Sequence, residues 1–135
     1  MKAYLSRRYR LSASHRLHTD SYSPERNREV YGKCNHPHGH GHNYVVELTV
    51  SGPVDPETGM VCDLAQLDGL AKREIVERFD HCNLNLDPVF ADVVPTTENF
   101  CLEIFKVIQA GLVHGKLEKV RVEETGKNFF EYAGT

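Results

Sequence analysis

The sequence predicts an α+β fold in which an antiparallel sheet carries two helices on one of its faces. Four segments alternate apolar and polar residues as strands do, and two longer segments repeat apolar residues at helical spacing. These elements follow the order strand, strand, helix, helix, strand, strand, which is typical of an antiparallel sheet with its helices on one side. A length of 135 residues suits one buried core, so we expect a single domain over residues 1–135.

The first two strands are predicted at residues 9–15 and 44–50. Neighbouring side chains of a strand point to opposite faces, so Leu11, Ala13 and His15 share one face, and charged and hydroxyl side chains occupy the other. His15 is therefore expected to point to the same side as the apolar residues. A run rich in turn-forming residues follows the second strand.

Three further segments complete the predicted strands. Residues 117–124 and 129–132 are expected to be strands joined by a short turn-forming link. Residues 60–62 are a candidate for a further short strand that leads into the first helix.

Both helices have recognisable ends in the sequence. The first is predicted at residues 64–79, because Asp63, followed three positions later by a glutamine, resembles a capping box. The second is predicted to begin at Thr96 or Thr97 and to end at Gly111, where a glycine would supply a left-handed cap. The polar residues 17–33 are expected to form a long loop, which in a compact domain often has a function.

Composition excludes several classes of protein. The formal net charge of −3 gives no reason to expect nucleic-acid binding, and no apolar stretch is long enough to span a bilayer. The N-terminus has no secretory signal pattern, and the four cysteines form no CxxC pair. We therefore expect a cytoplasmic protein with free thiols, and with neither nucleic acid nor membrane as a partner.

Histidines give the densest chemical signal. Residues 34–44 contain four histidines at alternate positions, and the last two, His40 and His42, are best placed to enter the following strand with their rings aligned. Neutral imidazole is a common zinc ligand, and His15 on the inward face of the first strand is the natural third ligand. Three histidines leave one coordination position open, which is typical of catalytic zinc sites.

Other interpretations of the same histidines are possible. His15 could be a hydrogen-bonded core residue, and the histidine-rich run could be an exposed loop with incidental metal affinity. Spacing alone leaves the roles of His36 and His38 open. Because the run leads directly into a well-patterned strand, a functional metal site is the favoured hypothesis.

Cysteine and an Asp-His pair are further candidates for chemistry. Cys34 lies beside Lys33 and near the expected metal, and positive charge favours the reactive thiolate; the alternative is a small buried hydrophobe. Asp80 could orient the imidazole of His81 for acid–base work, or the pair could form a polar helix end.

Glu124 shares strand parity with Val120 and Val122 and is expected to face the apolar side, whereas Glu123 faces the polar side. A carboxylate on an apolar face needs a partner, because burying it alone costs several kcal/mol. A ligand with paired N–H donors and an ion pair at the strand end are both possible partners.

Taken together, six motifs resemble the 6-pyruvoyltetrahydropterin synthase family. They run nearly end to end and in order: SASHRL (12–17), KCN with HGHNY (33–44), DPETGMV (55–61), FDHCNLN (79–85), TTEN (96–99) and VEET (122–125). The resemblance implies the tunnelling fold, in which a four-stranded antiparallel sheet carries two helices. It also implies that three subunits close a barrel and that two trimers stack into a homohexamer, with active sites at subunit interfaces.

The resemblance implies a zinc site and excludes two of the histidines from it. His15, His40 and His42 match the family's Zn²⁺ ligands in this sequence. His36 and His38 match no ligand.

The resemblance also assigns catalytic and binding roles. Cys34 matches the catalytic thiol, and Asp80 with His81 matches its acid–base partners. Glu124 matches the carboxylate that anchors the pterin ring, with Thr97 nearby.

The implied substrate is 7,8-dihydroneopterin triphosphate, a small molecule that loses triphosphate in a zinc-dependent reaction to give 6-pyruvoyltetrahydropterin. Zinc would act as a Lewis acid on the side-chain hydroxyls, and no redox cofactor is needed, because an internal rearrangement moves the electrons. The alternative is a 6-carboxy-5,6,7,8-tetrahydropterin synthase of queuosine biosynthesis, which releases acetaldehyde as well as triphosphate. The long loop at 17–33 and the six-residue step from Cys34 to His40 resemble the pyruvoyl branch.

A hypothesis of another class is a non-catalytic protein that binds zinc or a pterin on this fold. Such a protein has no need of Cys34, Asp80, His81 and Glu124 together, so this is the minority interpretation.

Overall fold

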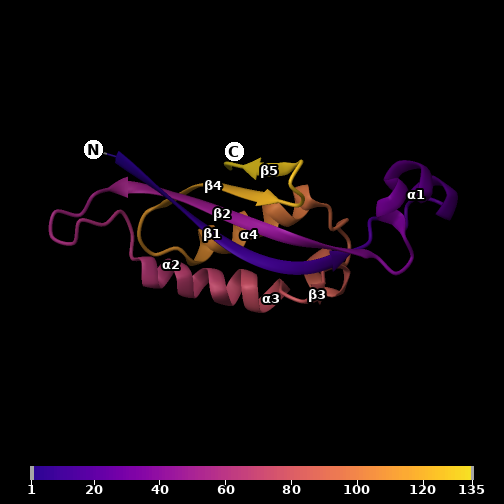
Figure 1. Cartoon of the computed structure of the whole chain (residues 1–135), viewed down its shortest axis with the longest axis horizontal. Coiled ribbons are helices and arrows are strands. Elements are labelled where there is room, and N and C mark those ends of the chain that lie inside the picture. Colours follow the sequence, from indigo (N-terminus) through magenta and orange to yellow (C-terminus); the bar gives the residue numbers. More distant parts are fainter. Residues whose placement is uncertain (1, 135) are drawn as a thin grey trace.

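A five-stranded sheet forms the centre of the computed structural model, which describes residues 2–134 (Figure 1). The strand order is β3–β1–β2–β4–β5, and neighbouring strands are antiparallel except β1 and β3, which are parallel. The predicted domain covers residues 1–135, of which 1 and 135 lie outside the described residues. The strands are β1 (Lys2–His15), β2 (His40–Pro53), β3 (Cys82–Asn83), β4 (Lys116–Glu123) and β5 (Phe129–Tyr132).

The prediction of four strands was wrong by one. Strand β3 is the additional strand, and it pairs with β1 only through Ala13 and Ser14. Two residues are too few to show an alternating pattern, so the sequence gives no sign of this strand. The candidate strand at 60–62 was also wrong, since none of these residues is in a strand and Val61 and Cys62 form a bend.

The first helix was predicted correctly over its whole length. Helix α2 (Leu64–Ala71) continues through a π-helical segment (Lys72–Val76) into α3 (Glu77–Phe79) without a break. The Asp63 side chain caps it by accepting hydrogen bonds from the backbone N–H groups of the second and third helical residues, at 3.0 and 3.2 Å. Local capping chemistry therefore fixes where this helix begins.

Helix α4 (Thr97–Gly111) has the predicted ends, but its last glycine has a different role from the predicted one. Gly111 is not among the described residues with positive φ, so the left-handed cap was wrong. A Cβ atom at Gly111 would lie 2.5 Å from Cδ1 of Leu70. The glycine therefore allows α4 to approach α2 closely.

The predicted loop at 17–33 was wrong in part, because it contains helix α1 (Pro24–Tyr31), which leads into a 3₁₀ turn (Gly32–Asn35). Figure 1 shows α1 projecting from the end of the molecule where β1 ends and β2 begins. Only Asn27 of this helix is buried, so the apolar periodicity of a core helix is missing. The one local signal is Ser23, which caps the helix before a proline at its first position.

Helices α2, α3 and α4 cover one face of the sheet (Figure 1). Alternate side chains of the strands point toward these helices and are buried, as the alternating sequence pattern predicts. These buried strand residues are Leu11, Ala13, His15, Tyr44, Val46, Leu48, Val50, Leu117, Val120 and Val122.

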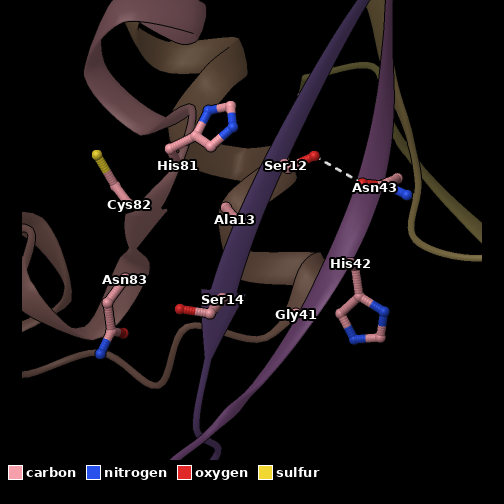
Figure 2. A pocket seen from close by; sticks show the side chains of 9 residues that line it. All are labelled: Ser12, Ala13, Ser14, Gly41, His42, Asn43, His81, Cys82 and Asn83. Carbon is pink, nitrogen blue, oxygen red and sulfur yellow. Dashed lines mark hydrogen bonds between the residues drawn. The ribbon is translucent and has the colours of Figure 1, made fainter.

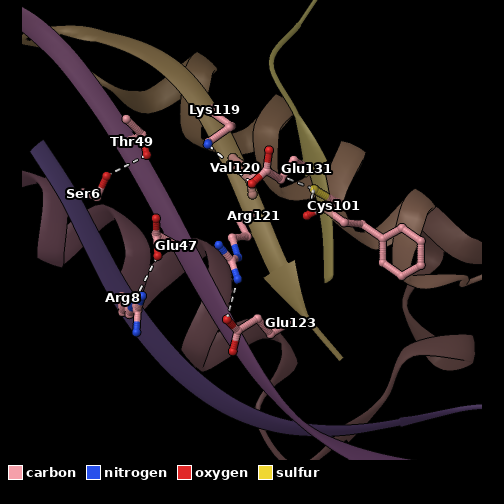
Figure 3. Close-up of polar contacts among 11 residues, drawn as sticks. Ser6, Arg8, Glu47, Thr49, Cys101, Lys119, Val120, Arg121, Glu123 and Glu131 are labelled. Atoms are coloured by element: carbon pink, nitrogen blue, oxygen red, sulfur yellow. Dashed lines mark hydrogen bonds and ion pairs between the residues drawn. The ribbon is translucent and has the colours of Figure 1, made fainter. Parts of the chain in front are cut away.

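The opposite face of the sheet carries polar contacts between neighbouring strands (Figure 3). Arg8 Nε donates to Glu47 Oε2 at 2.9 Å, and the Ser6 and Thr49 hydroxyl oxygens lie 2.8 Å apart. No helix of the part that the structure describes combines the length and apolarity needed to cross a lipid bilayer.

Candidate metal centre and active site

Three histidine rings meet where β1 ends and β2 begins. The antiparallel register places His15 opposite His40 and Ala13 opposite His42, so the two β2 histidines lie on the same face as His15. His15 Nε2 lies 3.1 Å from His40 Nε2, and the His40 and His42 ring centroids are 4.7 Å apart. The spacing in the sequence therefore brings together the three predicted ligands.

Gly39 permits this close approach of the two strands. Its φ is +76°, and a Cβ atom there would lie 3.0 Å from the carbonyl oxygen of His15. A side chain at this position would be strained and would push the start of β2 away from β1.

His15 is held in a defined tautomer by the segment that precedes α4. Its ring is 1% exposed, and Nδ1 lies 2.7 Å from the carbonyl oxygen of Pro95. Since a carbonyl only accepts, Nδ1 carries the proton, which leaves the lone pair on Nε2 directed at the other histidines. Burial, above all, lowers the pKa of His15, and burial also lowers the pKa of His40. Neutral imidazoles with free lone pairs are what a metal cation requires.

Glu124 joins the three histidines. Its side chain is 14% exposed, and Oε1 lies 3.0 Å from His42 Nε2 and 3.7 Å from His15 Nε2. It directly follows β4, whose Glu123 pairs with Val45, so continuing the register places Glu124 beside Tyr44. One potential ligand atom from each of the four residues lies within 4.8 Å of the others, and this group could bind a metal ion.

Cys34 lies beside this group, in the turn that follows α1. Its carbonyl accepts from the backbone N–H of Leu17 at 2.8 Å, and the Asn35 side chain donates to the Leu17 carbonyl at 2.9 Å. Burial, followed by the negative charge of Glu124, raises the pKa of the Cys34 thiol. The expectation that Lys33 favours the thiolate was therefore wrong, because Lys33 does not contribute to the shift. A bound metal cation would supply the positive charge that a thiolate needs.

Asp80 and His81 lie at the edge of the sheet, next to β1. Asp80 Oδ1 accepts from the backbone N–H of Ser12 at 2.8 Å, and this hydrogen bond is the main cause that lowers the Asp80 pKa. His81 has a positive φ of 59°, and its Nδ1 lies 3.1 Å from Asp80 Oδ2, so the predicted pairing is present. The His81 side chain is 84% exposed.

The Asp80–His81 pair is separate from the metal group within one chain. Among residues 2–134, no hydrogen bond or ion pair joins either residue to Cys34 or to the three histidines. An open depression of about 520 Å³ is lined by both His81 and His42, but Figure 2 shows their rings projecting to different sides of the β1–β2 pair. Within the described part of one chain, the proposed acid–base pair is therefore not joined to the thiol by a hydrogen bond or ion pair.

His36 and His38 lie outside the metal group. Both are exposed, and their ring centroids are 5.8 Å apart in the turn before β2.

Comparison with known proteins identifies the family. A sequence profile described as 6-pyruvoyl tetrahydropterin synthase matches residues 4–135. The chain belongs to the 6-pyruvoyl tetrahydropterin synthase family. Human 6-pyruvoyl tetrahydrobiopterin synthase is 49% identical over 134 residues, which cover 98% of this chain and 92% of the human protein. The structure of Caenorhabditis elegans 6-pyruvoyl tetrahydropterin synthase covers all of this chain and 97% of its own, with 39% identity and a TM-score of 0.96.

A relative named for a different activity matches a smaller part of the chain. The putative 6-carboxy-5,6,7,8-tetrahydropterin synthase of Archaeoglobus fulgidus is 40% identical over 93 residues, which cover 68% of this chain and 73% of that protein.

In this member of the 6-pyruvoyl tetrahydropterin synthase family, Tyr44 is a site residue that sequence reasoning missed. Its side chain is buried, and its ring lies edge-on to that of His42 at a centroid distance of 5.6 Å. Thr97, in the first turn of α4, is also buried near the Tyr44 hydroxyl. Neither hydroxyl makes a hydrogen bond within the described part of the chain. Strand parity could have found Tyr44, because it lies two residues after His42 and therefore on the same face.

Proposed function

We propose that this protein converts 7,8-dihydroneopterin triphosphate into 6-pyruvoyltetrahydropterin with release of triphosphate. The observation that carries the proposal is the group of three imidazoles and Glu124, together with a Cys34 thiol close enough for the charge of Glu124 to raise its pKa. Relatives that match this chain over nearly its whole length carry the name of that activity.

The metal in this proposal is Zn²⁺, held by His15, His40 and His42. Three imidazoles, one of them oriented by a backbone carbonyl, are a common ligand set for catalytic zinc. When bound, zinc supplies Lewis-acid polarisation of the hydroxyl groups on the substrate side chain.

Side chains of the protein bind the pterin ring and transfer the protons. Glu124, with Thr97 nearby, binds the pterin ring, because a carboxylate can accept from the ring N–H and the 2-amino group together. Cys34 removes a proton from the side chain of the substrate, and His81 with Asp80 transfers protons during the rearrangement.

Product analysis tests the reaction and distinguishes its two branches. The protein is incubated with 7,8-dihydroneopterin triphosphate, and the products are identified by mass. We expect 6-pyruvoyltetrahydropterin and triphosphate. The release of acetaldehyde would assign the chain to the 6-carboxytetrahydropterin branch, and bound zinc without any turnover would favour the non-catalytic alternative.

We further propose that the whole chain is one pterin synthase domain with the tunnelling fold, and that it assembles as a homohexamer, a dimer of trimers. The support is an open edge at each side of the described sheet. Strand β5 is one edge, and the outer side of β1 is paired only from Ser12 to Ser14, so residues 2–11 present unpaired backbone groups there. Such edges are suited to pairing with another chain.

An interface site makes a specific prediction for mixed assemblies. If Asp80 and His81 act on the Cys34 site of a neighbouring subunit, Cys34→Ala and His81→Ala proteins should each be inactive alone. Coexpression should restore activity to about one quarter of the parental value, since half the sites keep the thiol and half of those meet an intact His81. No recovery in mixed assemblies that are verified by mass would place the complete site within one chain.

The carboxylate that binds the ring gives a second prediction. Glu124→Gln keeps the shape but turns one acceptor oxygen into an NH₂ donor that faces the donors of the ring. Charge-assisted hydrogen bonds contribute about 1.5–3 kcal/mol each, so pterin affinity should fall at least about tenfold in an equilibrium titration.

The matched control is Glu123→Gln, which removes the same charge one residue away. Glu123 accepts from Arg121 at 3.0 Å on the polar face of the sheet (Figure 3), so pterin affinity should stay at the parental value. Equal affinity of the Glu124→Gln protein and the parent would refute the role of Glu124.

A further inference from the structure

We infer that Glu124 is a fourth ligand of the metal in the substrate-free protein, and that it leaves the metal for the pterin ring when substrate binds. The inference rests on the proposed function, in which three histidines hold zinc and Glu124 anchors the ring. It adds an exchange that couples the two binding events.

Three of the six distances within the group are close to those expected for four ligands around one ion. Ligand atoms about 2.0–2.2 Å from zinc in a tetrahedral site lie about 3.3–3.6 Å from one another. These separations are 3.1 Å for His15 Nε2 to His40 Nε2, 3.0 Å for His42 Nε2 to Glu124 Oε1, and 3.7 Å for His15 Nε2 to Glu124 Oε1. All pairs lie within 4.8 Å, so the carboxylate oxygen takes its place beside the three ring nitrogens.

The contact between Glu124 and His42 does not have the geometry of a hydrogen bond. His42 Nε2 is buried and makes no hydrogen bond to any of residues 2–134, although Glu124 Oε1 is only 3.0 Å away. His42 Nε2 and Glu124 Oε1 therefore face each other with no hydrogen aligned between them, as two ligand atoms of one cation do. A cation that both atoms can coordinate would be their shared partner.

The turn after β4 orients the carboxylate for this role. Asn128 Nδ2 donates to Glu124 Oε2 at 3.2 Å, and the Glu124 backbone N–H donates to the Asn128 carbonyl at 3.3 Å. One carboxylate oxygen is therefore occupied by the turn, and the other, Oε1, is directed at the histidines.

Binding of a pterin ring requires a different use of the same carboxylate. Recognition of a ring N–H together with a 2-amino group uses both oxygens as acceptors, and a metal cation bonded to Oε1 would withdraw negative charge from that oxygen and oppose an N–H donor beside it. The ring and the metal therefore compete for Glu124, and by reciprocity each lowers the affinity of the protein for the other. The exchange makes the metal accessible to substrate hydroxyls only after the ring has been recognised.

The first arm of the test measures zinc affinity by competition with a chromophoric chelator. Glu124→Gln should lose at least about tenfold in zinc affinity, since even residues that only support a ligand change metal affinity by about 10–100-fold. Glu124→Asp keeps the charge but shortens the side chain, and it should lose affinity as well. Glu123→Gln should bind zinc as the parent does.

Two results of this arm would overturn the inference. Parental zinc affinity in the Glu124→Gln protein would remove Glu124 from the ligand set. Weakened affinity in Glu124→Gln but parental affinity in Glu124→Asp would mean that only the charge acts, without coordination.

The second arm repeats the zinc competition with saturating 6-methylpterin, a ring without side-chain hydroxyls, and follows its binding by pterin fluorescence. Zinc affinity of the parent should fall by about fivefold or more, the lower end of typical coupling between sites, and that of Glu124→Gln should not change. Unchanged zinc affinity in a parent protein that binds the ring would overturn the exchange. No binding of the ring to the parent would instead contradict the proposed function, whatever the first arm shows.

Discussion

Replacing Cys34 with alanine should lower turnover by about 10²–10⁴-fold, the usual contribution of a positioned acid or base, and should leave the metal in place. The thiol lies beside Glu124 and is not one of the four residues whose ligand atoms converge. Its loss therefore removes a proton acceptor without removing a metal ligand. The rate of triphosphate release and the zinc content of the same preparation measure the two effects.

Cys62→Ala is the control for this substitution. Cys62 is a buried free cysteine that lies just before α2 and outside the metal group, and burial raises its pKa as it does for Cys34. Turnover in the Cys62→Ala protein should be close to the parental value. A Cys34→Ala protein that turns over substrate at the parental rate would refute the role assigned to the thiol.

Replacing His40 with alanine should cost more than about 100-fold in zinc affinity, beyond the usual effect of losing a supporting residue, and turnover should fall with it. His40 is the first residue of β2, and its ring contributes one of the converging nitrogens. Metal analysis after dialysis against a chelator gives the measurement.

His36→Ala is the control that shows whether the loss of zinc affinity is specific to His40 or follows from removing any histidine of this run. His36 belongs to the same histidine-rich run, but it is exposed and lies outside the metal group. The protein with that change should keep its zinc. Full retention of zinc in the His40→Ala protein would show that the metal site has been assigned to the wrong residues.

Most of the fold could be predicted because its signals are local. Alternation identified the four longer strands and their inward faces, and the caps at Asp63 and Thr96 marked the helix starts. Helix α1 and strand β3 were missed for physical reasons. The polar helix buries only one residue, and the two-residue strand exists only because it pairs with β1.

The metal group was the most predictable part of the site. The inward parity of His15, the alternate spacing of His40 and His42, and the parity of Glu124 all follow from the period of a strand. The approach of Glu124 to His42 depends on the register between β2 and β4, which local sequence does not encode.

Two other features lay beyond sequence reasoning. The raised pKa of Cys34 depends on burial and on Glu124, which is 90 residues away along the chain. The placement of the Asp80–His81 pair beside β1 depends on its hydrogen bonds with Ser12 and on where β3 joins β1.

The dependence of turnover on zinc tests the central claim most directly. Protein depleted of metal is supplied with 7,8-dihydroneopterin triphosphate, and triphosphate release is measured as zinc is titrated in. We expect no release at the start, a linear rise up to about one zinc per chain, and no further rise beyond that point. Release at the full rate without zinc, or a rise that continues well beyond one ion per chain, would contradict a reaction that depends on a single zinc held by His15, His40 and His42.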